Sequence, residues 1–150
     1  MLMESAKKIM LILTFISCLI SGGCENIEPL TIPNREFSLD LWSDWELELQ
    51  QGIDTYTGFY ANGHEKIYFD YGIFAGGNFN AVMGGPGVLY YEETIIDSFP
   101  AKIVKTVYNE NTELELLIDR GDEYSRVVVS VVNSNKDEKY IAIFKTFRFL

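Results

Sequence analysis

The sequence predicts a mostly β domain, built as a single antiparallel sheet or a sandwich of about seven or eight strands. Two observations carry this prediction. From residue 36 onward, apolar and polar residues alternate with a period of two over several short runs, which is typical of strands that bury one face. Turn signals separate the runs, and the clearest is Asn62-Gly63, the dipeptide most favoured in two-residue hairpins. Most neighbouring strands are therefore expected to be antiparallel.

The predicted strands follow one another through the whole domain. In chain order they lie near residues 37–41, 45–49, 55–60, 66–71, 88–94, 102–108, 114–119 and 124–132. The run RVVVSVV, residues 126–132, is apolar on both faces, a pattern that favours a strand in the middle of a sheet. Val127, Val129 and Val131 are therefore predicted to lie in the core.

A short helix is expected near the C-terminus, over about residues 136–145, and it would make the domain α+β. Apolar residues recur there at helical spacing: Tyr140, Ile141, Phe144 and Phe147. Asn135 and Glu138 are predicted to form a capping pair at the start of this helix. The alternative is a strand in which Lys145 interrupts the apolar face. A final short strand is expected at residues 147–149.

The first 23 residues are predicted to be a secretory signal peptide and not part of the fold. Lys7 and Lys8 form a basic start, residues 9–20 are almost entirely apolar, and small residues follow at positions 21–23. The apolar run is shorter than the roughly 20 residues that a membrane-spanning helix needs. The pattern therefore favours a cleaved signal over a permanent membrane span.

Cys24 follows directly, at the end of the segment LISGGC, residues 19–24. This segment resembles the lipobox of bacterial lipoproteins, in which the cysteine becomes the lipid-modified first residue of the mature chain. The resemblance implies a palmitate-bearing lipoprotein of the bacterial cell envelope, anchored at the outer membrane or on the periplasmic face of a membrane. Ser21 departs from the pattern, which has leucine at that position. An ordinary signal with an incidental cysteine is the alternative.

The mature chain of 127 residues fits one domain over residues 36–150, preceded by a tether at residues 24–35 that carries two prolines. Cys18 would leave with the signal, so Cys24 would be the single cysteine of the mature chain and no disulfide is expected. The signal carries two lysines and one glutamate, so its loss changes the net charge from −10 to −11. So acidic a chain repels phosphate backbones, and nucleic acid is not an expected partner.

Two family resemblances concern the body of the chain. The segment QGIDTYTGFYANGHEKIYFDYG, residues 51–72, is similar to a pattern in short uncharacterised bacterial lipoproteins. The opening EFSLDLWSDWELE, residues 36–48, and the ending IFKTFRF, residues 143–149, resemble the PsbP-like group of small sheet-and-helix domains. The long helices of that group are not evident here. Neither resemblance implies any catalytic residue.

The segment FDYGIFAGGNFNAVMGGPG, residues 69–87, contains six glycines in the sixteen positions that begin at Gly72. It lacks the P-loop pattern, and no lysine or arginine occurs between Lys66 and Lys102, so phosphate binding is not expected. The acidic spacing of a calcium loop is also missing. Neither a metal nor another cofactor is therefore expected.

Residues 73–87 are predicted to form a long irregular loop, because glycine disfavours both helix and strand. Loops longer than about 12 to 15 residues are usually functional or mobile. Phe74 and Phe79 are predicted to pin this one onto the sheet, as a lid over an aromatic face.

Ten aromatic residues lie between Tyr56 and Tyr91. Exposed rings beside asparagine and acidic side chains form surfaces that bind glycans or other small molecules, although aromatic rings also fill the cores of small sheets. The candidate ligand-binding residues are Tyr56, Tyr68, Asp70, Phe74, Asn78 and Tyr90. A binding or structural role is therefore expected, with the membrane as one partner through the anchor and a glycan or an envelope protein as the other.

No catalytic motif is found, so an enzyme is not expected. The alternative is a small glycan-acting hydrolase that uses Asp70 and Glu92, or Glu93 in place of Glu92, as its pair of carboxyl groups. That mechanism requires the two side chains to face each other across a cleft.

Overall fold

The computed structural model describes residues 27–31, 37–42, 44–52, 54–121 and 126–150. The predicted signal peptide and the lipidation site Cys24 lie outside the described residues. Within these ranges, no helix has the length and the apolar character that crossing a membrane requires.

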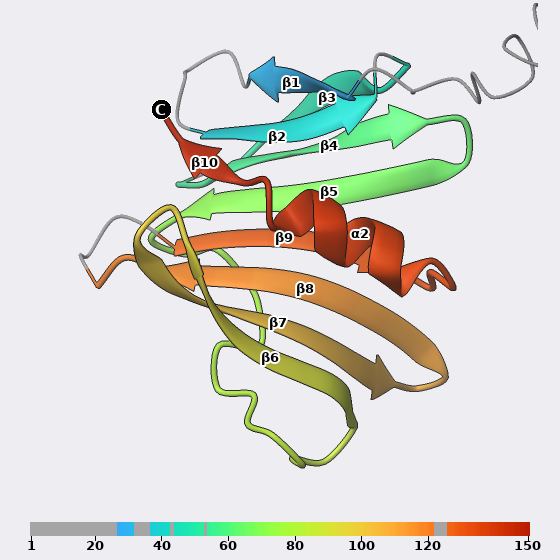
Figure 1. Cartoon of the computed structure of the whole chain (residues 1–150), viewed down its shortest axis with the longest axis vertical. Helices are drawn as coiled ribbons and strands as arrows, with labels where there is room; N and C mark the ends of the chain where they lie inside the picture. The colour runs from blue at the N-terminus through green and yellow to red at the C-terminus, as the bar shows by residue number, and fades with distance from the viewer. Residues whose placement is uncertain (1–26, 32–36, 43, 53, 122–125) are drawn as a thin grey trace, which may run out of the picture.

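A seven-stranded antiparallel sheet forms most of the molecule (Figure 1). Its strands, in spatial order, are β3 (Glu46–Gln51), β4 (Tyr56–Asn62), β5 (Glu65–Gly72), β9 (Arg126–Val132), β8 (Asn111–Asp119), β7 (Phe99–Tyr108) and β6 (Val88–Ile96). A smaller sheet has the order β1 (Ile27–Thr31), β2 (Phe37–Trp42) and β10 (Arg148–Phe149). The mostly β fold class and the final strand are therefore confirmed.

β1 lies within the segment predicted to be a tether, and it pairs with β2 over its whole length. The described part of the fold therefore already includes residues 27–31, ahead of the predicted boundary at residue 36. Pro29 interrupts the strand signal in the sequence, because proline cannot donate to a ladder of hydrogen bonds. β1 is at the edge of its sheet, where one side of a strand needs no partner, so proline is tolerated there.

Tight turns join the strands of the three hairpins β4–β5, β6–β7 and β7–β8. In the first, Asn62 pairs with Glu65 and the two-residue loop is Gly63-His64, one position beyond the predicted dipeptide. In the other two, both loop residues have positive φ: Asp97-Ser98, at 48° and 75°, and Asn109-Glu110, at 47° and 68°. Such turns match the right-handed twist of paired strands.

Alternate residues of each strand point to opposite faces of the main sheet. One face, here called the helix face, packs against β2, β10 and the helix α2 (Asp137–Phe144) and holds the main core. β9 is the fourth of the seven strands, and Val127, Val129 and Val131 are buried in this core, as predicted. Val128 and Ser130 are buried on the opposite face.

α2 lies within the predicted range, but the predicted capping pair is wrong. The N-cap residue is Lys136, and no side chain caps the helix there. Asn135 and Glu138 therefore do not form the expected box, because contacts from a distant strand hold the first turn.

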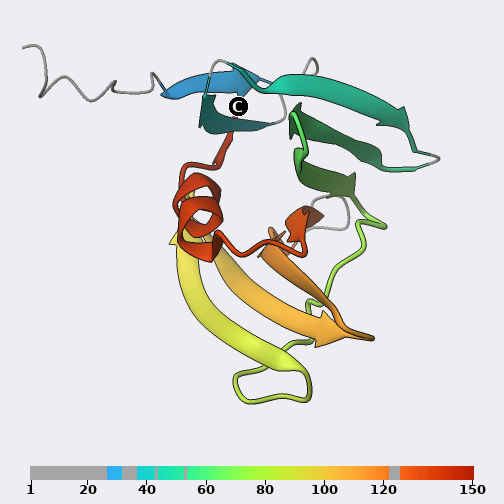
Figure 2. The ribbon, with the colours of Figure 1, turned by 90° about the vertical axis from the view of Figure 1, so that its right-hand side faces the viewer.

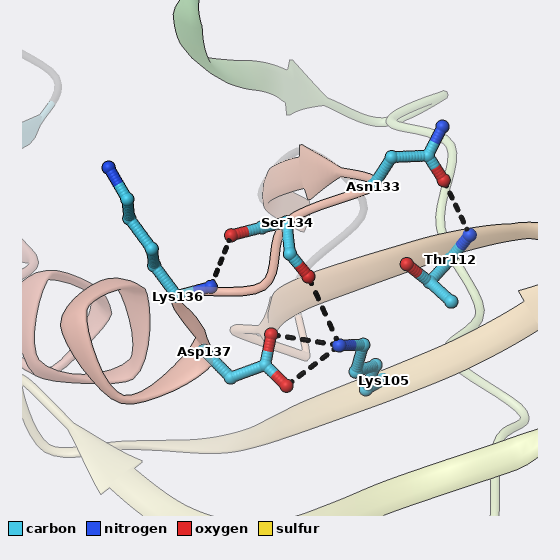
Figure 3. Close-up of polar contacts among 6 residues, drawn as sticks. All are labelled: Lys105, Thr112, Asn133, Ser134, Lys136 and Asp137. Atoms are coloured by element: carbon cyan, nitrogen blue, oxygen red, sulfur yellow. Dashed lines mark hydrogen bonds and ion pairs between the residues drawn. The ribbon is translucent and has the colours of Figure 1, made fainter.

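Those contacts come from Lys105 of β7 (Figure 3). Its Nζ binds the two carboxylate oxygens of Asp137 at 2.7 and 2.9 Å and the backbone oxygen of Ser134 at 3.3 Å. In the preceding connection, the Asn133 side chain accepts a hydrogen bond from the Thr112 backbone N–H at 2.9 Å. The start of α2 is thus fixed to β7, and Asp137 also places a negative charge at the positive end of the helix dipole.

Candidate functional site

Residues 73–87, here called the strap, connect β5 to β6 without a helix or a strand, as predicted. β9, β8 and β7 lie between these two strands in the sheet, so the strap has to cross them. It crosses the face opposite α2, here called the strap face, and Figure 2 shows α2 and the strap on opposite sides of the sheet. The irregular segment is therefore a cover over the middle of the sheet.

Small residues allow the strap to lie close to the strands. Ala75 and Ala81 are buried in a cluster that includes Leu117 and Val128. A Cβ atom on Gly77 would lie 2.7 Å from Val128 Cγ2 and 2.8 Å from Leu117 Cδ2, closer than carbon atoms normally approach. A larger residue at this position would therefore force either the strap or these two side chains to shift.

Lys102 of β7 fixes the middle of the strap. Its Nζ donates hydrogen bonds to the backbone oxygens of Phe79 at 3.0 Å and of Ala81 at 3.3 Å. The Phe79 ring also packs on the guanidinium group of Arg126, 5.0 Å from the ring centroid. Phe79 thus pins the strap as predicted, whereas Phe74 does not, because it is 68% exposed.

Beside the strap lies a polar cavity of about 560 Å³, here called the acidic cavity. Three carboxyl groups line it, those of Asp70 on β5 and of Glu113 and Glu115 on β8. Hydroxyl groups from four strands add to the lining: Thr57, Tyr68, Thr106 and Ser130. The volume falls within the range of about 300 to 1,000 Å³ that is usual for small-molecule sites.

Glu115 is the most deeply buried carboxyl group of this cavity, with only 5% of the residue exposed. Burial, and secondarily the like charge of Glu113, raise the pKa of Glu115 to about 7. The backbone N–H of Asn78, in the strap, donates a hydrogen bond to Glu115 that opposes this rise. Near neutral pH the carboxyl group is therefore divided between its neutral and its charged form.

Asp70 faces the cavity from β5. Its Oδ2 accepts a hydrogen bond from the Gly76 backbone N–H in the strap, at 3.0 Å. Its Oδ1 is buried and has no hydrogen-bond partner within the part of the chain that the structure describes. A buried oxygen without a partner costs free energy, so the fold holds this carboxyl group at the edge of the cavity at a cost to its stability.

The structure brings together three of the six predicted ligand-binding residues, namely Tyr68, Asp70 and Asn78. Tyr56 packs against the main core, and Tyr90 also lies on the helix face. Phe74 lies on the strap, exposed to solvent. The six residues therefore do not form one aromatic platform, because alternate strand positions separate them between the two faces.

The strand register also separates the carboxyl groups of the hydrolase alternative. Glu92 is aligned across the strands with Phe69, the neighbour of Asp70, so Glu92 and Asp70 point to opposite faces. Glu92 is instead paired with Lys145 at 2.8 Å, and this contact is the main reason that its pKa is lowered. Glu93 shares a face with Asp70 but lies four strand spacings away, roughly 19 Å along the sheet.

Sequence reasoning missed Glu113, Glu115 and Ser130 as site residues. The two glutamates alternate with leucines and therefore look like the solvent face of a strand. One signal was available, because Ser130 is the only polar residue inside the apolar run VVVSVV. A lone serine in a central strand indicates that something polar faces it.

A second cavity of about 610 Å³ lies farther along the strap face. Its lining combines apolar residues, including Ile95 and Leu117, with Lys102 and Arg126. Both cations are already engaged, Lys102 by the strap and Arg126 by Asp119 at 3.2 Å. This cavity therefore offers fewer free polar groups than the acidic cavity.

The acidic cavity can hold a polar ligand by hydrogen bonds and charge. No group of three or more histidine, cysteine, aspartate or glutamate side chains within the described ranges is arranged to hold a metal ion. Comparisons with protein-family models, with curated proteins and with solved structures found no match to this chain.

Proposed function

We propose that this protein is a lipid-anchored component of the bacterial cell envelope that binds a small polar ligand in the acidic cavity. One observation carries the binding role: the carboxyl groups of Asp70, Glu113 and Glu115 line a cavity of about 560 Å³ that has no lysine, arginine or histidine in its lining. The anchor rests on the lipobox-like segment that ends at Cys24.

A binding role explains why the fold buries a carboxyl group, which in a purely structural role would only lower the stability of the fold. Glu115 is a buried carboxyl group, and burying such a group lowers the stability of a fold unless a partner compensates. The binding role is also favoured over the hydrolase alternative, since Asp70 and Glu92 lie on opposite faces of the sheet.

The test compares two tyrosines that are almost equally exposed, Tyr68 at 38% and Tyr90 at 37%. The full chain, purified in detergent, is screened by thermal shift against sugars, amino sugars, amino acids and amines. We expect any compound that stabilises the protein to bind about tenfold more weakly to Tyr68→Ala, because that ring is part of the cavity wall. Binding to Tyr90→Ala should equal that of the unchanged protein.

Equal losses in the two variants would mean that the ligand does not use the acidic cavity. A panel in which no compound stabilises the protein would contradict the binding role as well.

A further inference from the structure

We propose that the acidic cavity selects a ligand that carries a protonated amine, and that the ammonium group lies between Asp70 and Glu115 beside the ring of Tyr68. This inference rests on the proposed binding function and specifies the chemical class of its ligand.

The wall of the cavity carries acidic groups and no basic ones. Asp70, Glu113 and Glu115 line it, and none of its lining residues is a lysine, arginine or histidine. Ion pairs elsewhere in the described chain involve other acids: Asp40, Glu65, Glu92, Asp119 and Asp137. The three carboxyl groups of the cavity therefore have no ion-pair partner among the described residues, and a cation from outside can pair with them.

The acidic groups of the cavity also have hydrogen-bonding capacity that the described chain does not use. Asp70 Oδ1 is buried without a partner in the described residues, although water or a ligand normally satisfies such an atom. An ammonium group carries three donors and no acceptor. It can therefore donate to several carboxylate oxygens and has no lone pair that would repel them. A neutral hydroxyl has one donor and two lone pairs, so it suits these oxygens less well.

The strand register brings the two carboxyl groups and the Tyr68 ring to one part of the sheet. Tyr68 of β5, Ser130 of β9 and Glu115 of β8 are aligned in one row across the sheet, and Asp70 is the next residue of β5 on the same face. The outer strands of that row are about 10 Å apart, twice the usual strand spacing. Side chains that point inward from both strands can reach one small group between them.

Tyr68 adds a contact that is specific for cations. Its ring lies in the cavity wall and is partly exposed, and the negative face of an aromatic ring attracts an ammonium group. An aromatic ring beside two carboxyl groups therefore favours an ammonium ligand over a neutral sugar of similar shape.

The experiment uses two matched pairs of probes that differ in charge and little in shape. They are 4-aminocyclohexanol with 1,4-cyclohexanediol, and 1,5-diaminopentane with 1,5-pentanediol. Binding to the full chain in detergent is measured by isothermal titration calorimetry at about pH 8, where the Glu115 carboxyl is mostly ionised. We expect the amine of at least one pair to bind and its neutral partner not to bind.

Two variants locate the ammonium group, and a third is the control. Asp70→Asn and Glu115→Gln should each weaken amine binding by about tenfold or more, because each removes a charged hydrogen-bond partner. Glu48→Gln removes the same charge from the exposed edge strand β3 and should leave affinity unchanged. Affinity for 1,5-diaminopentane should also fall from about pH 8 to about pH 6, as Glu115 takes up a proton while the amines stay charged.

Several outcomes would overturn the inference. They are no binding by either amine, equal binding of amine and neutral partner, or equal losses in Glu48→Gln and the two cavity variants. If the thermal-shift panel yields a neutral ligand that depends on Tyr68, the amine inference fails while the binding function stands. If the panel yields no ligand that depends on Tyr68, both fail.

Discussion

At the scale of single residues, Glu113 and Glu115 show how the environment of a glutamate changes the pKa of its carboxyl group. They stand two apart on β8 and point to the same face. Glu113 is partly exposed, whereas the strap covers Glu115 and supplies the backbone N–H of Asn78. The covered residue therefore has a pKa of about 7, and this pKa makes the stability of the fold depend on pH.

The Glu115→Gln variant tests this dependence. The pKa is raised from 4.5 in the unfolded chain to about 7 in the folded one, so the folded state keeps its proton longer as pH rises. Stability from this group is fully present below about pH 4.5 and is lost as pH rises through 7. We expect Glu115→Gln to be more stable than the unchanged protein at about pH 8, by up to about 3 kcal/mol.

Urea unfolding at about pH 4 and about pH 8 measures the difference, which should nearly vanish at the lower pH. Glu110→Gln, in an exposed turn, is the control and should change stability little at either pH. A gain for Glu115→Gln that is the same at both pH values would show that the carboxyl group is not the cause.

At the scale of elements, the strap is the segment on which the site depends. It has no regular hydrogen bonding of its own, and its position comes from Lys102, Gly77 and the apolar contacts of Ala75 and Ala81. Contacts at several points along its length therefore hold it against the sheet as a cover.

Lys102→Met should loosen the strap while the sheet stays folded. The substitution keeps the apolar stem of the side chain but leaves the backbone oxygens of Phe79 and Ala81 without their charged donor, at a cost of about 2 kcal/mol. We expect faster hydrogen exchange over residues 75–81 and unchanged protection in β8 and β9. Lys66→Met, whose Nζ lies over the Phe59 ring 4.0 Å from its centroid, is the control outside the strap.

Unchanged exchange over residues 75–81 in Lys102→Met would mean that packing alone holds the strap. A loss of protection throughout the sheet would instead assign Lys102 to the stability of the whole fold.

The elements also show why some local predictions fail. Strand positions follow from the period-two pattern, and that pattern correctly places β9 in the centre of the sheet. The capping prediction at Asn135 fails because Lys105, 32 residues before Asp137, binds the first turn of α2. β1 is missed because its pairing with β2, and not its own composition, makes it a strand.

At the scale of the whole molecule, the two ends of the long axis differ. β1, which is the described strand closest in sequence to Cys24, lies at one end, and the strap lies towards the other (Figure 1). The strap is therefore separated along this axis from the described strand nearest in sequence to Cys24.

Cys24→Ser tests the anchor directly. The substitution removes the thiol that would carry the lipid, so we expect the protein to move from the membrane fraction to the soluble fraction. Mass spectrometry of the N-terminal peptide should show a lipid on the unchanged protein only. Identical fractionation of the two proteins, with no lipid on either, would contradict the anchor.

The sequence by itself determined the mostly β class, the central strand, the C-terminal helix and the irregular strap, because each depends on local periodicity or on the backbone preferences of glycine. Only the tertiary structure decided which polar residues meet. Asp70 and Glu115 are 45 positions apart, and their shared face follows from β9 inserting between β5 and β8. Strand order and strand register determine which residues become neighbours across the sheet. Neither can be read from a short stretch of sequence, because both depend on how distant segments pair.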